Sequence, residues 1–586
     1  MISKEVLQGK PFYLTDEQVK WVYDTLGSLT LDEKIGQMFC PMGLSGDESY
    51  LRHLVEDLHI GGILYRTSGK GDIIAAHTTA QKLAKVPLLL AANLECGGDG
   101  ITVDGTSMGK PMAIAATDNL ENARHMGEVS ATEGSAVGIN WAFSPVVDLD
   151  LEFHNPITNV RTFGDDADRV IAYAGEYIKA ADEQGVAATI KHFPGDGTDE
   201  RDQHLVTTIN RLSCEEWDAT YGKIYQALID QGVRSVMVGH IAQPAYVKHF
   251  KPDATDEEVI CPGSLSKEVV TDLLRGKLGF QGLITTDSTQ MMGFSSAMPR
   301  AEAIPRAAAV GCDVILFTKQ LDEDQQFMKD GIASGKVSME RIDEAVTRIL
   351  ALKASLKLPE RKANDTLIPA EKEEKIGCEQ FKTWAAQAAD EAVTLVRDKQ
   401  NLLPISPEKY PRLYLNVIQK NLTANTPLAL EWKKLFEQEG FDVTLRDRTV
   451  EVTAEDIYFV DRTTPEKRAL VEEMYRSIQG TREHYDLYVY IVFMENASNN
   501  TTVRLNWNVA YGMGDDAPWH ASEVPVLMIS LANPYHLFDA PMVKTYINAY
   551  DSSPAYHKAV IEKVMGRSEF KGKSPVDPFC GKFYLK

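Results

Sequence analysis

The chain lacks the excess of positive charge that binding to nucleic acid or to an anionic membrane requires. Its 586 residues include 61 Lys and Arg against 84 Asp and Glu, which gives a formal net charge of -23 at pH 7. Phosphate backbones and anionic lipid surfaces both need a basic protein face. We therefore expect no nucleic-acid partner and no membrane partner, and we predict a small ligand that is not a polyanion.

Long apolar runs and paired cysteines are also missing. No apolar run is long enough to span a bilayer, and the first ten residues contain no apolar signal core, so we expect a cytoplasmic location. The seven cysteines are an odd number without a CxxC spacing, and we expect reduced core thiols. Because His192, His204 and His240 lack the local spacing of a zinc site, we expect no metal and no organic cofactor.

A Gly-x-Gly-x-x-Gly dinucleotide turn is absent after the first strand, which argues against an open Rossmann-type sheet. The first 350 or so residues instead repeat a strand followed by a helix-like segment. The predicted strands are Gly61–Tyr65, Pro87–Ala92, Trp141–Val147, Val186–Ile190, Val233–Val238, Leu283–Thr286 and Val314–Phe317. With one more strand expected near the start, this α/β pattern predicts a (β/α)8 TIM-type barrel.

The pattern breaks after a predicted helix at 338–353. A Pro-containing stretch from Leu358 and a charged run from Glu371 are typical of a linker. Further strands are predicted at Thr394–Arg397, Leu413–Val417, Val443–Leu445, Tyr485–Val492, Val526–Ser530 and Lys544–Asn548. We therefore predict a catalytic barrel domain at 1–357, a linker at 358–376 and an α/β sandwich domain with a mostly parallel sheet at 377–586.

The richest concentration of chemical groups runs from Lys191 to His204, Lys-His-Phe-Pro-Gly-Asp-Gly-Thr-Asp-Glu-Arg-Asp-Gln-His. It follows an apolar strand, so Lys191 and His192 fall at that strand's C-terminal end, where α/β barrels place their chemistry. Asp202 and His204 form an Asp-x-His pair in the loop that follows. By itself such a pair is more often polar surface, but next to the strand-end cation and imidazole it favours acid/base chemistry.

A second feature is Asp287, which the strand Leu283–Thr286 delivers to the same end of the barrel. A carboxylate in that position suits a nucleophile. Taken alone, an Asp after a strand is more often the cap of the next helix.

Together these motifs resemble glycoside hydrolase family 3, in particular its bacterial β-N-acetylglucosaminidase branch. The segments that carry the resemblance begin at Asn155-Pro-Ile-Thr-Asn-Val-Arg161, Lys191-His-Phe-Pro-Gly, Asp202-Gln-His204, Met237-Val-Gly-His240, Leu278-Gly-Phe-Gln-Gly and Leu531-Ala-Asn-Pro-Tyr535. The family combines a barrel that bears the active site with an α/β sandwich, which agrees with the two predicted domains. The resemblance implies a small carbohydrate substrate.

The resemblance also implies residue roles. Asp287 would be the nucleophile that forms a covalent glycosyl-enzyme, with His204 as the acid/base and Asp202 as its orienting carboxylate. Arg161, Lys191 and His192 would bind sugar hydroxyls and the acetamido group. A phosphate site is the competing interpretation of such a cationic cluster, and a buried ion pair is the plainer one for Arg161.

The chain departs from the branch at three places. Asn93 stands where an Asp usually holds sugar hydroxyls, so an amide replaces a carboxylate that can only accept hydrogen bonds. Gly98-Asp99 stands where cell-wall-recycling members have an Arg, and a muropeptide substrate therefore does not follow. Asp196 replaces the His of Pro-Gly-His-Gly, either as a turn residue or as a group that changes the electrostatics of the loop.

Four functions follow, in decreasing order of preference. The first is a retaining exo-β-N-acetylglucosaminidase or β-hexosaminidase. The second is a β-glycoside phosphorylase on the same scaffold, since a neutral imidazole does not repel phosphate as an ionised carboxylate does. The third is a family 3 β-glucosidase that uses Glu495 of the second domain, and the fourth is a sugar-binding relative without turnover.

Overall fold

The computed structural model describes residues 2–420, 425–494, 498–505, 507 and 516–586. The chain forms two compact units. The first contains Met1–Pro111, Asn119–Trp384 and Ser498–Thr501, and the second contains Met112–Asp118, Ala385–Ala497 and Thr502–Lys586. The domain limits 1–357, 358–376 and 377–586 stay a prediction, and the helix α17 (Leu358–Ala363), inside the predicted linker, belongs to the first unit.

The first unit is built on a parallel barrel, which confirms the predicted fold class. Its sheet has nine strands in the order β1-β11-β10-β8-β6-β5-β4-β3-β2. They are β1 (Phe39–Cys40), β2 (Met42–Gly43), β3 (Gly62–Tyr65), β4 (Leu89–Ala92), β5 (Trp141–Ala142), β6 (Ala187–Phe193), β8 (Ser235–Val238), β10 (Leu283–Ser288) and β11 (Val314–Leu316). A separate pair joins β7 (Thr208–Ile209) to β9 (Ile241–Ala242) in parallel.

The strand that closes the barrel is interrupted by Pro41, which separates β1 from β2. Proline has no N–H to give to a β-ladder, so the strand breaks there. Its carbonyl still accepts from the Leu64 N–H at 3.1 Å. Because β1 pairs with β11 and β2 pairs with β3, the nine strands occupy the eight positions of a closed barrel. The further strand predicted near the start lies here.

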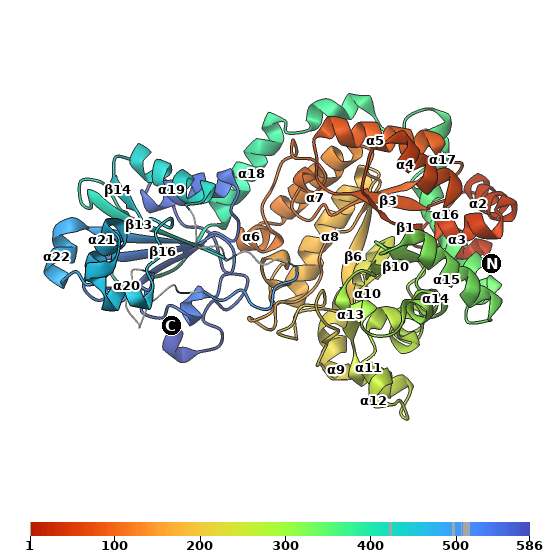
Figure 1. The fold of residues 1–586 in the computed structure, drawn as a ribbon. Coiled ribbons are helices and arrows are strands. Elements are labelled where there is room, and N and C mark those ends of the chain that lie inside the picture. The colour runs from red at the N-terminus through yellow and green to blue at the C-terminus, as the bar shows by residue number, and fades with distance from the viewer. Residues whose placement is uncertain (1, 421–424, 495–497, 506, 508–515) are drawn as a thin grey trace. The chain divides into compact units, whose positions relative to one another are not determined.

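Helices surround the barrel strands, as Figure 1 shows for α5, α7, α8, α14 and α15. The helices of the first unit are α1 (Lys4–Gln8), α2 (Asp16–Ser28), α3 (Leu31–Gln37), α4 (Glu48–Arg52), α5 (Lys70–Leu83), α7 (Leu120–Ala136), α8 (Ala167–Glu183), α9 (Cys214–Trp217), α10 (Lys223–Gln231), α11 (Pro244–Phe250), α12 (Asp256–Val259), α13 (Met292–Ser295), α14 (Arg300–Ala309), α15 (Leu321–Ala333), α16 (Met339–Ser355) and α17. The helices α6 (Pro111–Ala116) and α18 (Glu379–Ala392) cross the limits of the units. None of the helices within the described ranges is long and apolar enough to cross a membrane.

Helix α8 illustrates how the sequence builds this layer. Asp166 caps its first turn by accepting from the Arg169 N–H at 2.8 Å. Most of its buried side chains recur at helical spacing, at Val170, Tyr173, Ala174, Tyr177, Ile178 and Ala181. The Tyr177 hydroxyl donates to the Leu94 carbonyl at 2.7 Å, just beyond the end of β4. The helix is thereby held against the strand ends that carry the site.

The second unit contains the predicted, mostly parallel sheet. Its order is β12-β17-β16-β15-β13-β14, and only the edge strand β12 runs antiparallel to its neighbour. The strands are β12 (Thr394–Asp398), β13 (Arg412–Gln419), β14 (Asp442–Leu445), β15 (Leu487–Phe493), β16 (Val526–Ser530) and β17 (Thr545–Asn548), and the helices are α19 (Pro427–Gln438), α20 (Ala454–Tyr458), α21 (Pro465–Met474), α22 (Ile478–His484) and α23 (Pro554–Val564). The central strands β13, β15 and β16 are buried along nearly their whole length, as expected for a sheet covered on both faces.

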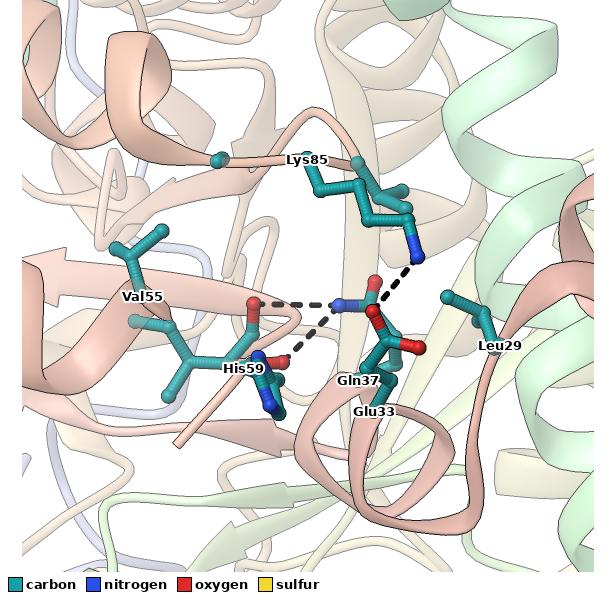
Figure 2. Close-up of a pocket in the computed structure, with 9 residues that line it drawn as sticks. Leu29, Glu33, Gln37, Val55, His59 and Lys85 are labelled. Carbon is teal, nitrogen blue, oxygen red and sulfur yellow. Dashed lines mark hydrogen bonds and ion pairs between the residues drawn. The ribbon is translucent and has the colours of Figure 1, made fainter. Parts of the chain in front are cut away.

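Lys353 is buried at the end of the barrel where the strands begin, opposite the C-terminal rim. A cavity of about 20 Å³ lies there, and Figure 2 shows the residues that line it. The Gln37 amide donates to the carbonyls of His59 and Ile60 at 3.1 and 3.4 Å. The Gln37 carbonyl oxygen accepts from the Lys353 ammonium of α16 at 2.6 Å. Burial lowers the pKa of Lys353 from 10.5 to about 7.

The buried lysine predicts a pH dependence of stability. Below pH 7 Lys353 is charged in both the folded and the unfolded protein, so burying its charge lowers the stability of the fold by the full amount. Between pH 7 and 10.5 Lys353 is neutral in the folded protein but still charged in the unfolded protein, so this loss of stability shrinks as pH rises. Relative to Lys353→Met, the parent should gain about 2 kcal/mol in free energy of unfolding between pH 7 and pH 9. Urea unfolding of both proteins at the two pH values measures this, and a pH-independent difference would contradict it.

Candidate active site

Two barrel strands change register at the point where they deliver side chains to the C-terminal rim. The pairing of β6 with β8 shifts between Ile190 and Phe193, and the pairing of β10 with β11 shifts between Thr285 and Ser288. Such irregularities re-aim side chains at the ends of strands. Lys191, His192 and Asp287 lie in these irregular segments and are buried.

The imidazole of His192 lies between two carboxylates. Its Nδ1 is 2.7 Å from Asp148 Oδ2, and its backbone N–H donates to Asp148 Oδ1 at 3.0 Å. Its Nε2 is 3.8 Å from Asp287 Oδ2. Because Asp148 accepts a hydrogen bond from Nδ1–H, it sets the tautomer and the plane of the His192 ring. Asp148 is not one of the predicted site residues.

Asp287 is held as an anion. Burial by itself would raise its pKa, but His192, His240 and His204, together with the Ser288 N–H that donates to Oδ1 at 2.6 Å, outweigh burial and lower this pKa below 3.8. An ionised carboxylate at the barrel rim has the charge state that nucleophilic attack requires.

The orientation of His240 follows from its partners. Its Nε2 is 2.9 Å from the Ser288 carbonyl, which can only accept, so Nε2 carries the proton. Its Nδ1 then accepts from the Ser264 hydroxyl at 2.8 Å. Burial lowers the pKa of His240, consistent with a neutral ring that fixes the backbone beside Asp287.

A separate cluster of charges surrounds Glu95. Both oxygens of Glu95 accept from the Arg161 guanidinium at 2.8 and 2.9 Å, and Oε1 is also 2.6 Å from Lys191 Nζ. Burial would raise the pKa of Glu95, but Arg161 and Lys191 hold it well below 4.5. Lys191 also donates to Asn93 Oδ1 at 3.3 Å. Arg161 therefore takes part in a buried ion pair, and three of its five N–H donors are occupied by Glu95 and the Ile157 carbonyl.

Asp202 and His204 form the predicted pair. His204 Nδ1 is 2.7 Å from Asp202 Oδ1, which also accepts the His204 backbone N–H at 2.8 Å. The Asp202 side chain is fully buried, whereas that of His204 is 23% exposed. The other oxygen, Oδ2, accepts the Asn499 N–H at 2.7 Å, from the segment Ser498–Thr501 that belongs to the first unit. Because Nδ1 donates to Asp202, Nε2 of His204 is the nitrogen left to exchange a proton.

The loop that carries His204 is joined to the segment that follows Asp287. The Met292 N–H donates to the His204 carbonyl at 2.9 Å, and the Thr207 hydroxyl donates to the Gly293 carbonyl at 2.9 Å. Beside this loop is a cavity of about 690 Å³, whose walls come from the loops after β6, β8 and β10. Its lining includes Arg201, Val206, Thr207, Ile260, Met298 and Arg306.

The first unit thus brings all seven predicted site residues to one end of the barrel, in two groups. Asp287, His192, His204 and Asp202 belong to a network of imidazoles and carboxylates, and Lys191, Arg161 and Asn93 meet at Glu95. Asp148 and Glu95 were not predicted as site residues, although both follow predicted strands just as Asp287 does. Glu495 lies outside the described residues. Within the described ranges, no group of three or more His, Cys, Asp and Glu side chains is arranged to hold a metal ion.

The charge cluster predicts a large stability loss on Glu95→Gln. Lys191 and Arg161 would then lie together in a buried site without their anion, which should cost roughly 3 kcal/mol in free energy of unfolding at pH 7. Because the folded-state pKa of Glu95 is lowered, this loss should shrink as pH falls below 4.5.

The matched control is Glu33→Gln. The Glu33 side chain has the same 14% exposure as Glu95, but its partner Lys85 is 63% exposed. We expect less than about 1 kcal/mol for this control. Denaturant unfolding of the three proteins measures both values, and equal losses for the two variants would contradict a special role of the Glu95 cluster.

The chain is similar to known proteins over nearly its whole length. Residues 30–352 match the family described as "Glycosyl hydrolase family 3 N terminal domain". A "Beta-N-acetylglucosaminidase/beta-glucosidase" of Cellulomonas fimi is 43% identical over 578 residues, 98% of this chain and 99% of that protein. A "Beta-hexosaminidase" of Tolumonas auensis is 31% identical over 271 residues, 45% of this chain and 77% of that protein.

Solved structures give the same result. The structure "Beta-glucoside phosphorylase BglX bound to 2FGlc" has a TM-score of 0.91 and 43% identity, covering 99% of this chain and 100% of that chain. A family 3 β-N-acetylglucosaminidase of Paenibacillus shares the fold at 24% identity and a TM-score of 0.74, covering 95% and 100%. With a family match over more than half of its residues and a relative 43% identical along almost its entire length, this enzyme belongs to glycosyl hydrolase family 3.

Proposed function

We propose that the enzyme removes a terminal β-linked glucose or N-acetylglucosamine from a small glycoside with retention, and that phosphate opens the covalent intermediate. The observation that carries this proposal is the His204–Asp202 pair, which offers an imidazole as the acid/base on the barrel rim that also bears Asp287. We place phosphate ahead of water, the acceptor favoured by the sequence alone. The support is the whole-chain likeness to a protein described as a β-glucoside phosphorylase.

The first step forms the glycosyl-enzyme. An Asp287 oxygen attacks the anomeric carbon, and the bond from that carbon to the leaving oxygen breaks. His204 donates its Nε2 proton to the leaving oxygen, which avoids the expulsion of an alkoxide. Asp202 stabilises the imidazolium before transfer and keeps the ring in place through Nδ1.

The second step transfers the sugar to phosphate. A phosphate oxygen attacks the anomeric carbon, the bond to Asp287 breaks, and a sugar 1-phosphate leaves with retained configuration after two inversions. Once His204 has given up its proton it is neutral, so it does not repel the phosphate anion as a carboxylate acid/base would. The Asp202 charge lies behind the ring, with both oxygens bonded to N–H donors.

The sugar is proposed to bind at the second group of residues. Lys191 and Arg161 present hydrogen-bond donors that suit hydroxyl and carbonyl oxygens, and His192 faces the nucleophile. Asn93 takes the place of a carboxylate, so a hydroxyl there meets an amide that both donates and accepts. This change favours neither glucose nor N-acetylglucosamine decisively, and the chain resembles relatives described as acting on both.

The acceptor is tested with dinitrophenyl β-glucoside and dinitrophenyl β-N-acetylglucosaminide. These substrates form the intermediate quickly, so its breakdown limits turnover. We expect phosphate to raise kcat at least tenfold over sulfate at equal ionic strength, with sugar 1-phosphate as product. His204→Glu is the matched variant, and it should lose the phosphate effect by charge repulsion while retaining hydrolysis. Equal rates in phosphate and sulfate would show that water is the acceptor.

The nucleophile is tested with Asp287→Ala. We expect turnover to fall more than about 10³-fold, because no covalent intermediate can form. Added azide should restore cleavage of the dinitrophenyl substrates and give a glycosyl azide of inverted configuration, since only one displacement then occurs. Unchanged thermal unfolding is the control for folding. Residual turnover with retained configuration would place the nucleophile elsewhere.

A further inference from the structure

Gln203, between the two members of the acid/base pair, is fully buried and bonded at both ends of its amide. Its Oε1 accepts the His240 backbone N–H at 2.8 Å, and its Nε2 donates to Asp196 Oδ2 at 3.2 Å. A backbone N–H can only donate, so Oε1 must face His240 and Nε2 must face Asp196. The side chain therefore connects the loop after β6 to the loop after β8 in one defined orientation.

The carboxyl group of Asp196, which accepts from the Gln203 amide, is itself held by other donors. Asp196 Oδ1 accepts from the Gly197 N–H at 2.7 Å and from the Asn155 amide at 3.3 Å. The Asp196 backbone N–H donates to Asp148 Oδ1 at 2.8 Å. By the resemblance described above, Asp196 stands where the related branch has His. Its buried side chain accepts hydrogen bonds from Gly197, Asn155 and Gln203, so it does more than form a turn.

Backbone contacts hold the same loop from further directions. The carbonyl of Gln203 comes so close to Gly293 that a Cβ there would lie 2.5 Å from the oxygen. The Met292 N–H bonds the His204 carbonyl, and the Asn499 N–H bonds Asp202. The hydrogen bonds of the Gln203 side chain go to Asp196 and to the His240 N–H, so it can be changed without replacing Asp202 or His204.

We propose that Gln203 is a positioning residue that fixes the Asp202–His204 pair in its working place before the sugar binds. The inference rests on the proposed function of His204 as the acid/base. A general acid must lie within hydrogen-bond reach of the leaving oxygen. If the loop that carries His204 is displaced, proton transfer to that oxygen is therefore the first step to slow down. The proposed attack by Asp287 comes from another strand, β10, and needs no proton from this loop.

The test is Gln203→Met on a series of aryl β-glycosides whose leaving phenols span a wide range of acidity. Methionine keeps the length of the side chain and its buried volume but makes neither hydrogen bond. We expect kcat/KM to fall 10- to 100-fold for poor leaving groups that need a proton, and by less than threefold for dinitrophenol, which does not. The slope of log kcat/KM against the pKa of the phenol should therefore become steeper.

Two readouts separate positioning from general damage. Amide hydrogen exchange in residues 198–206 should speed up in Gln203→Met and stay unchanged elsewhere in the barrel. The surface variant Gln326→Ala loses an exposed hydrogen bond from the Gln326 amide to Asp330 on α15, and it should match the parent in both measurements. An equal loss for all leaving groups, or unchanged exchange in the loop, would overturn the proposal.

The result is distinguishable from a failure of the proposed function. A parent protein that cleaves no glycoside would refute the assigned activity and with it the leaving-group effect. In that case hydrogen exchange still decides whether Gln203 fixes the loop. If the parent cleaves glycosides but its slope of log kcat/KM against the pKa of the phenol equals that of Gln203→Met, the proposed activity stands and only the positioning role is rejected.

Discussion

The site depends on one buried carboxylate that is not among the proposed reacting groups. Asp148 accepts the Nδ1 proton of His192, the backbone N–H of His192 and the backbone N–H of Asp196. A buried carboxylate is stable only when such donors satisfy it. Through His192 it sets the ring that faces Asp287, and through Asp196 it sets the base of the loop that carries His204. One group thus positions both halves of the site.

The charges at the barrel rim are divided in a way that suits attack by a carboxylate. Glu95 is paired with both Lys191 and Arg161, while the largest influences that lower the pKa of Asp287 come from three imidazoles. A lysine or arginine bonded directly to Asp287 would keep it ionised but would also occupy the oxygen that is proposed to attack. Imidazoles beside it favour the charged form and leave the oxygen accessible.

Local pattern predicted much of this architecture, because strand and loop signals are local. Every predicted strand overlaps an observed one, although Trp141–Val147 is longer than β5, since Pro145 has no N–H to continue the ladder. Strand ends and motifs together led to Asp287, His192 and Lys191. The partners Asp148, Glu95 and Gln203 were not predicted, because each acts through a contact with residues distant along the chain. Gln203 was visible only as the middle residue of Asp202-Gln-His204.

The sequence by itself determined that a parallel barrel precedes a second α/β sheet, which residues reach the barrel rim and which family they resemble, since these follow from periodicity and short motifs. Only the tertiary structure decided which carboxylate orients which imidazole, that Arg161 is paired with Glu95, and that Asp196 accepts a hydrogen bond from Gln203. The reason is physical: the charge and orientation of a buried group depend on donors and acceptors that folding brings together from different strands.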